Sequence, residues 1–123
     1  MKSKVKIKWL KKPEDHDYPS AESYLNLIYD DKVSAELTNK LKKAKAIDFK
    51  SKDIFRASEL SLLGISNIHV ERDIKRIKKG LTLSPLLLVR DSINGKVIIA
   101  DGYHRLCAVY WFDEDAIIPC RIV

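Results

Sequence analysis

The chain has 123 residues, of which 46% are hydrophobic and 33% are charged, and its net charge is +6 with neutral histidines. This length fits one domain over residues 1–123, and the composition is that of a folded protein and excludes a disordered chain. No stretch approaches the roughly 20 apolar residues of a membrane-spanning helix. We therefore expect a cytoplasmic protein without a membrane partner, whose basic balance suits phosphates or an acidic surface.

The two cysteines, Cys107 and Cys120, do not form a CxxC pair, and no group of histidines and cysteines has the spacing of zinc ligands. The first residues lack the apolar core of a signal peptide, so we expect reduced thiols, as in a cytosol. Both cysteines stand among apolar residues and are expected in the core. The sequence predicts no protein-bound metal.

The first third of the chain predicts one strand and two helices. Residues 4–10 alternate lysines with apolar side chains, which is typical of a half-buried strand, although a nucleic-acid footprint is the alternative. Beyond a polar connection, helices are predicted over about 20–29, capped by Ser20, and from a cap at Ser34 to about residue 45. The lysines that close the second helix suit the negative end of its dipole.

The middle of the chain is less regular. Residues 46–49 and 53–56 are short apolar-polar mixtures that predict strands, and residues 57–65 are ambiguous. A helix is then predicted from a cap at Ser66 or Asn67 as far as Gly80. Its core-facing residues are Val70, Ile74 and Ile77.

The last third has the clearest pattern. Residues 85–90 and 96–100 are apolar strands joined by a turn that contains Asn94-Gly95, and they predict a hairpin. A helix over about 103–111 and a strand over 117–123 follow. Together the elements indicate an α+β fold with a small mixed sheet and helices.

The hairpin ends at a short polar turn, residues 101–105, with the sequence Asp-Gly-Tyr-His-Arg. A helix that begins here exposes unpaired N–H groups at the positive end of its dipole, and Gly102 permits close approach of a ligand. His104 and Arg105 add side-chain donors for a phosphate. The structural alternative is that Asp101 caps the helix and that Arg105 pairs with the acidic residues 113–115.

The run from Gly80 to Val123 resembles the core of the ParB/sulfiredoxin superfamily. The shared pattern is a helix, a glycine, a strand with proline at its start, a hairpin, a glycine-containing turn that opens a helix, and a final strand preceded by proline. The resemblance implies a ParB/sulfiredoxin-like domain with its core over residues 46–123. Residues 1–45 match it poorly.

Three branches of the superfamily differ at the turn. Sulfiredoxins carry Gly-Gly-Cys-His-Arg, and Tyr103 stands where their catalytic cysteine would be, so sulfiredoxin activity is not expected. ParB-type CTPases carry Gly-Glu-Arg-Arg and a helix-turn-helix domain that this chain lacks. Free-serine kinases carry Asp-Gly-His-His-Arg, which differs only at Tyr103. The resemblance implies that residues Gly102, Tyr103, His104 and Arg105 hold the phosphates of ATP, ADP or CTP, with Mg²⁺ as a candidate companion.

For catalysis the candidates are Asp101 and His104, in a phosphotransferase or a nucleotide hydrolase. Phosphoryl transfer relies on positioning and charge neutralisation, so Asp101 is suited to hold Mg²⁺ or a hydroxyl group, and Glu59 or Glu71 is a candidate base. A second phosphate contact is expected at Ser66, Asn67 and His69, where another helix begins. Plain capping by Ser66 or Asn67 is the alternative there.

Two other functions stay open. The first is nucleic-acid binding, because the basic run over residues 75–79 suits DNA or RNA, although no reading helix is evident. The second is a partner-binding module that keeps the fold without catalysis. The aromatic residues 110–112 suit base stacking or, more simply, packing on the core. The acidic residues 113–115 suit a solvated turn, and the sequence leaves the oligomeric state undecided.

Overall fold

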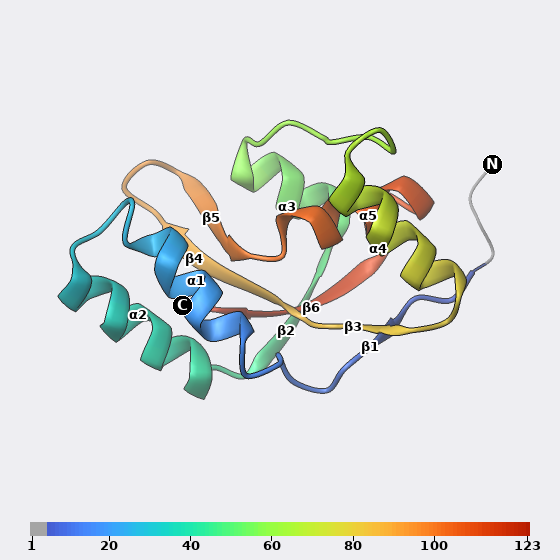
Figure 1. Ribbon diagram of the computed structural model, residues 1–123. Helices are drawn as coiled ribbons and strands as arrows, with labels where there is room; N and C mark the ends of the chain where they lie inside the picture. The colour runs from blue at the N-terminus through green and yellow to red at the C-terminus, as the bar shows by residue number, and fades with distance from the viewer. Residues whose placement is uncertain (1–4) are drawn as a thin grey trace.

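The computed structural model describes residues 5–123, which form five helices and six strands (Figure 1). In chain order these elements are β1 (Lys8–Trp9), α1 (Asp17–Leu25), α2 (Asp31–Lys43), β2 (Ala46–Lys50), α3 (Ser51–Ser58), α4 (Ile68–Lys78), β3 (Thr82–Leu83), β4 (Leu86–Asp91), β5 (Lys96–Asp101), α5 (Tyr103–Phe112) and β6 (Ile117–Ile122). This confirms the α+β class. Within residues 5–123 there is no helix with the length and apolar character needed to cross a membrane.

The main sheet has four strands in the order β2-β6-β4-β5, with the parallel pair β4–β6 in the centre and antiparallel pairs on both sides. The hairpin β4–β5 turns through residues 92–95, where Gly95 has a φ of 66° that glycine adopts without strain. A second, two-stranded sheet pairs β1 with β3 in parallel. The small mixed sheet predicted from the sequence is thus confirmed.

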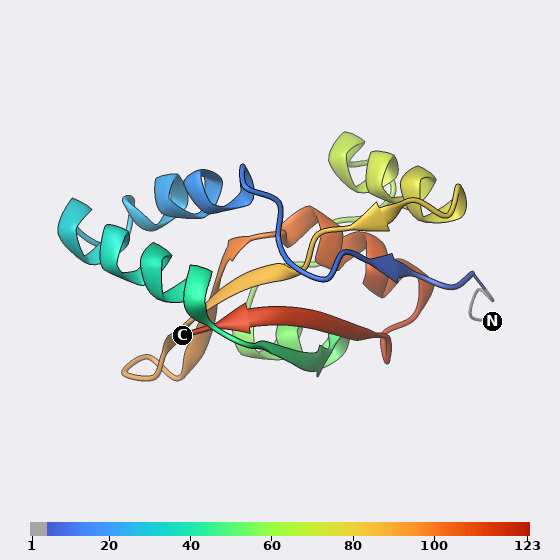
Figure 2. The same cartoon turned by 90° about the horizontal axis from the view of Figure 1, so that it is seen from below.

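Helices cover both faces of the main sheet (Figures 1 and 2). One apolar cluster joins β4 and β6 to α3, α4 and α5, and the other joins β4 and β5 to α1 and α2. Alternate residues of β4 divide between the two clusters, with Leu86 and Leu88 on one face and Leu87 and Val89 on the other. This double burial explains why residues 85–90 form a continuous apolar run.

The two N-terminal helices begin earlier than the sequence predicted. Helix α1 starts at Asp17 and not after Ser20, because Pro19 fits the first turn, where its missing N–H would have no partner. Helix α2 is capped by Asp30, whose Oδ1 accepts a hydrogen bond of 2.8 Å from the Val33 N–H. Ser34 is therefore not the cap and lies buried inside the helix.

The strand predicted over residues 53–56 is wrong, because this stretch belongs to α3. Its buried residues Ser51, Ile54 and Ser58 recur at spacings of three and four, which is a helical period that a four-residue window concealed. The strand predicted over 4–10 is reduced to β1, and Lys4 lies outside the described residues. The sequence also missed β3, which has only two residues.

Candidate functional site

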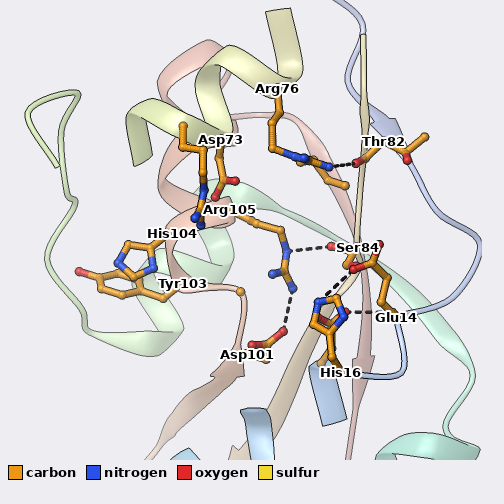
Figure 3. A pocket seen from close by; sticks show the side chains of 14 residues that line it. Glu14, His16, Asp73, Arg76, Thr82, Ser84, Asp101, Tyr103, His104 and Arg105 are labelled. Carbon is orange, nitrogen blue, oxygen red and sulfur yellow. Dashed lines mark hydrogen bonds and ion pairs between the residues drawn. The ribbon is translucent and has the colours of Figure 1, made fainter. Parts of the chain in front are cut away.

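A cleft of about 550 Å³ opens where α4, the start of α5 and the loop before α1 meet (Figure 3). We call it the α4–α5 cleft, and its volume is within the usual range for small-molecule sites. Its ionisable side chains come from these three segments, from the first residue of α1 and from the end of β5. They are Glu14, His16, Asp17, Arg72, Asp73, Arg76, Asp101, Tyr103, His104 and Arg105.

The start of α5 forms one wall of this cleft. Gly102 is the N-cap residue, with a φ of 111°, and no side chain caps the helix there. A Cβ on Gly102 would lie 2.8 Å from Leu86 Cγ, so glycine is needed both for its conformation and for the space. The N–H groups of residues 103–105 have no partner within the helix. The alternative in which Asp101 caps α5 is therefore wrong.

Arg105 holds the turn together. Its Nε donates to the Ser84 carbonyl at 3.0 Å, and its Nη2 donates to the Pro85 carbonyl at 3.2 Å and to Asp101 Oδ2 at 3.0 Å. The predicted pairing with residues 113–115 is wrong, since the carboxylate partner is Asp101, and both side chains of this pair are 17% exposed. Only the Nη1 group of Arg105 is left for a ligand, because Nε and Nη2 already hold the turn in place.

Burial raises the pKa of Asp101, while the charge and hydrogen bond of Arg105 act in the opposite direction. The charge of Asp17, the first residue of α1, raises the pKa of Asp101 further, whereas His16 in the preceding loop lowers it. Asp101 is thus well placed beside the cleft but already has a firm partner.

Tyr103 and His104 begin α5 and both line the cleft. The Tyr103 hydroxyl donates a hydrogen bond to the Ser61 carbonyl. The His104 ring packs against the His69 ring, with their centroids 4.8 Å apart. Burial lowers the pKa of His104, and the neighbouring His69 lowers it further. A neutral imidazole at this position can accept a proton, and its N–H can donate a hydrogen bond.

The start of α4 is arranged differently from that of α5. Asn67 Oδ1 accepts hydrogen bonds from the N–H groups of His69, at 3.0 Å, and Val70, at 3.2 Å. Ser66 and Asn67 do not line the α4–α5 cleft, and His69 reaches it only through its contact with His104. The capping alternative therefore describes this helix start, and the structure does not bring Ser66 or Asn67 to the phosphate turn.

The sequence reasoning missed the residues that α4 contributes from its second turn. Asp73 lines the cleft, is only 6% exposed, and has no hydrogen bond or ion pair to the described residues, 5–123. Burial raises its pKa, which the charges of Arg72, Arg105 and Arg76 partly offset. Its sequence position held a signal, because Asp73 lies three residues after Val70 and four before Ile77, on the apolar face of the helix.

Arg76 lines the cleft one turn farther along α4. One nitrogen, Nη2, donates a long hydrogen bond of 3.4 Å to the Thr82 carbonyl, and Figure 3 shows the guanidinium reaching across the top of the cleft. The two glutamates proposed as bases lie elsewhere. Glu71 pairs with Lys75 at 3.3 Å, and Glu59 ends α3; neither lines the cleft.

The loop before α1 and the first residue of this helix bring three further ionisable side chains to the rim of the cleft. His16 Nε2 lies 3.0 Å from Glu14 Oε2 and 3.4 Å from Asp17 Oδ1. Carboxylate oxygens and imidazole nitrogens are the donor types that hold divalent cations. The spacing of Glu14, His16 and Asp17 differs from the cysteine and histidine patterns of zinc sites, so the sequence predicted no metal at these residues.

A second hollow of about 410 Å³ meets the cleft at the turn after β5. Both are lined by residues 101–104, but the second is otherwise lined by the mainly apolar side chains of Tyr24, Leu60, Ile99 and Ala100. We call it the Tyr24 hollow. Tyr24 and Leu60 are 42% and 40% exposed, so apolar surface is open to a ligand there.

The arrangement offers backbone and guanidinium donors for an anion, with carboxylates and a neutral imidazole beside them. It is thus suited to bind a phosphate and to move a proton near it. Comparison of the chain with protein-family models, with curated proteins and with solved structures gave no match.

Proposed function

We propose that the chain is a nucleotide-binding protein that holds its ligand's phosphates in the α4–α5 cleft and there transfers or hydrolyses a phosphoryl group. The observation that carries the proposal is the uncapped start of α5, which opens into a cleft lined by Arg76, His104 and the remaining Nη1 of Arg105. N–H groups at a helix start bind anions, and arginine adds charge-assisted hydrogen bonds.

The Tyr24 hollow supports a nucleotide over a simple phosphate. It adjoins the cleft at residues 101–104 and presents apolar surface, including the Tyr24 ring. A ligand with phosphates in the cleft could place a flat base in this hollow, where stacking on an aromatic ring stabilises any base. The two neighbouring environments match the two ends of a nucleotide.

The resemblance to the ParB/sulfiredoxin superfamily belongs to the same proposal. Its expected parts between Gly80 and Val123 correspond to β4, β5, α5 and β6. Thiol chemistry of the sulfiredoxin type finds no support, because Tyr103 replaces the cysteine and Cys107 is fully buried. The cleft carboxylates instead favour phosphoryl chemistry, in which they orient a hydroxyl group or water.

The nucleic-acid alternative has weaker support from the basic run on α4. Lys75 pairs with Glu71, Lys78 lies over the Trp111 ring at 5.4 Å, and Arg76 reaches into the cleft. Three of the basic side chains of this run thus have different neighbours in the protein. We therefore place the nucleotide proposal first.

Calorimetric titration with ATP, ADP, CTP, GTP and inorganic tripolyphosphate, each with and without Mg²⁺, tests the proposal. We expect wild type to bind a nucleotide at micromolar concentration, and Arg76→Ala to weaken binding about tenfold or more, because a hydrogen bond to a charged group contributes roughly 1.5–3 kcal/mol. Lys75→Ala removes the same charge from the same helix outside the cleft and should change affinity less than about twofold. Arg105 is a poorer test residue because its loss would also disturb the turn.

Two outcomes would count against the proposal. If no nucleotide binds at millimolar concentration, the nucleotide function is wrong. If tripolyphosphate binds as tightly as every nucleotide, the Tyr24 hollow does not hold a base. If a nucleotide does bind, release of inorganic phosphate or of the nucleoside diphosphate from it would identify the reaction.

A further inference from the structure

The loop before α1 is folded so that Glu14 and Asp17 face each other. The Asp17 N–H donates to the Glu14 carbonyl at 3.0 Å, and the Glu14 N–H donates to Asp17 Oδ2 at 3.0 Å. These reciprocal bonds close one turn and fix both residues relative to the start of α1. The second oxygen of Asp17, Oδ1, is then turned toward His16. The backbone of the loop thus fixes the Asp17 carboxylate, and the exposed side chains of Glu14 and His16 lie beside it.

Two of the three separations between the donor atoms match those around a metal ion. His16 Nε2 lies 3.0 Å and 3.4 Å from its two carboxylate neighbours, and all three atoms lie within 4.8 Å of one another. Two ligands that are each about 2.1 Å from a metal, at angles of about 90° to 110°, are separated by roughly 3.0–3.4 Å. The two short separations therefore suit a cation between the donors as well as they suit direct hydrogen bonds.

A surface ion pair alone accounts poorly for this cluster. The His16 side chain is 74% exposed, and an exposed pair contributes little to stability. Asp17, in contrast, is buried to 3% exposure, and its carboxylate has been withdrawn from water to face the cleft rim. Withdrawal of a carboxylate from water is unfavourable unless a cation or several donors compensate it. The Glu14 N–H supplies one donor to Asp17 Oδ2, and a cation at Oδ1 would complete the compensation.

The charge of the whole cleft gives a second, independent reason. Its lining includes four carboxylates, Glu14, Asp17, Asp73 and Asp101, against only three guanidinium groups, so its net charge is −1 when the histidines are neutral. Asp73 is also more than nine-tenths buried and has no hydrogen bond or ion pair to residues 5–123. A polyphosphate would meet a cleft that is not positive overall, and a bound divalent cation would correct this.

We propose that Glu14, His16 and Asp17 bind a divalent metal ion at the rim of the α4–α5 cleft. One imidazole with two carboxylates suits Mn²⁺, Co²⁺ or Zn²⁺, whereas Mg²⁺ prefers oxygen ligands alone. Three protein ligands leave coordination positions open toward the cleft, as in catalytic metal sites. The role of the ion, to neutralise phosphate oxygens, rests on the proposed function, but the binding of the ion itself does not.

Metal titration in the absence of any phosphate tests the site. Mn²⁺ binding is measured by the loss of the free-ion electron paramagnetic resonance signal, and Zn²⁺ binding by calorimetry. We expect one site in wild type, and at least tenfold weaker binding in His16→Ala and in Glu14→Gln. The control Glu36→Gln removes an exposed carboxylate from α2, far along the chain from the loop, and should bind as wild type does. Circular dichroism melting confirms that each variant is folded.

Absence of Mn²⁺ and Zn²⁺ binding to wild type at millimolar concentration would overturn the metal site, as would equal affinity in wild type and both ligand variants. A second pair of titrations tests the metal site and the nucleotide site independently of each other. Arg76→Ala should lose affinity for tripolyphosphate and keep its metal, whereas His16→Ala should lose the metal and keep metal-free phosphate binding. Metal binding without nucleotide binding would leave this site standing and remove the proposed function.

Discussion

Helices α4 and α5 both begin beside each other at one end of the sheet, yet their first turns are finished in different ways. The side chain of Asn67 accepts hydrogen bonds from the first N–H groups of α4, whereas the N-cap residue of α5 is Gly102, which has no side chain. Sequence patterns marked both starts as anion sites. The difference shows that a helix start is available to a ligand only where the chain does not supply its own cap.

The two helices consequently contribute different chemistry to the cleft. Helix α5 presents backbone donors from its first turn, close to the pair formed by Asp101 and Arg105. Helix α4 presents side chains from its second and third turns, where Asp73 and Arg76 line the cleft. The wall formed by α5 thus presents backbone N–H groups beside a bonded pair of side chains. The wall formed by α4 presents charged side chains that have few partners in the protein.

The largest effect is expected from Gly102→Ala. The new Cβ would lie 2.8 Å from Leu86 Cγ and 3.0 Å from Arg105 Nη2, at a φ of 111° that alanine rarely adopts. Backbone strain and overpacking together should lower the free energy of unfolding by about 3 kcal/mol. Chemical denaturation monitored by circular dichroism measures the change.

Gly64→Ala is the matched control, because a Cβ there would meet nothing within 4 Å and the φ is not in the left-handed region. It should change the unfolding free energy by less than about 0.5 kcal/mol. Similar losses in the two variants would show that the start of α5 has no special requirement for glycine.

Asn67→Ala examines the other helix start. Removal of the cap leaves the N–H groups of His69 and Val70 without their side-chain acceptor, and we expect a loss of about 1 kcal/mol in unfolding free energy. Nucleotide affinity should stay within twofold of wild type, because Asn67 does not line the cleft. A tenfold loss of affinity in a folded Asn67→Ala protein would show that α4 also binds phosphate at its start.

The sequence predicted the last third of the fold well and the first third less well, for physical reasons. Burial of β4 on both faces produces an unbroken apolar run, and Asn94-Gly95 marks the turn, so local patterns suffice there. The start of α2 depended on which polar residue acts as its cap, and α1 begins without any side-chain cap. Asp30 and Ser34 are both of a residue type that caps helices, and the sequence alone does not decide between them.

The candidate site was predicted only in its contiguous part. Residues 101–105 could be found because strand, glycine and helix follow one another in the chain. The partners of Arg105 could not, since Ser84 and Pro85 precede it by some twenty residues. Asp73 left a trace as a carboxylate on an apolar helix face, whereas the cluster of Glu14, His16 and Asp17 depends on a turn that sequence spacing did not reveal.

The smallest effect is expected from Asp73→Asn, and it should be stabilising. Burial raises the pKa of Asp73 above its ordinary value of 3.8, so between this pH and the higher pKa of the folded state the folded protein binds more protons than the unfolded one. The Asp73 carboxylate therefore has no effect on stability below pH 3.8, lowers stability progressively as the pH rises toward the pKa of the folded state, and has its full effect above that pKa. An asparagine of similar shape removes the unfavourable charge, while the loss of attraction to Arg72 and Arg105 offsets part of the gain.

At pH 7 we expect Asp73→Asn to raise the unfolding free energy by at most about 1 kcal/mol, because the carboxylate is largely buried and the nearby arginine charges offset only part of this cost. The difference from wild type should shrink as the pH falls and vanish below about 3.8. Asp53→Asn, an exposed carboxylate on α3, is the control and should show little change at either pH. If Asp73→Asn instead destabilises the protein at pH 7, the carboxylate has a stabilising partner within the fold. The two walls of the cleft would then be alike, because Asp101 beside α5 is also paired, with Arg105.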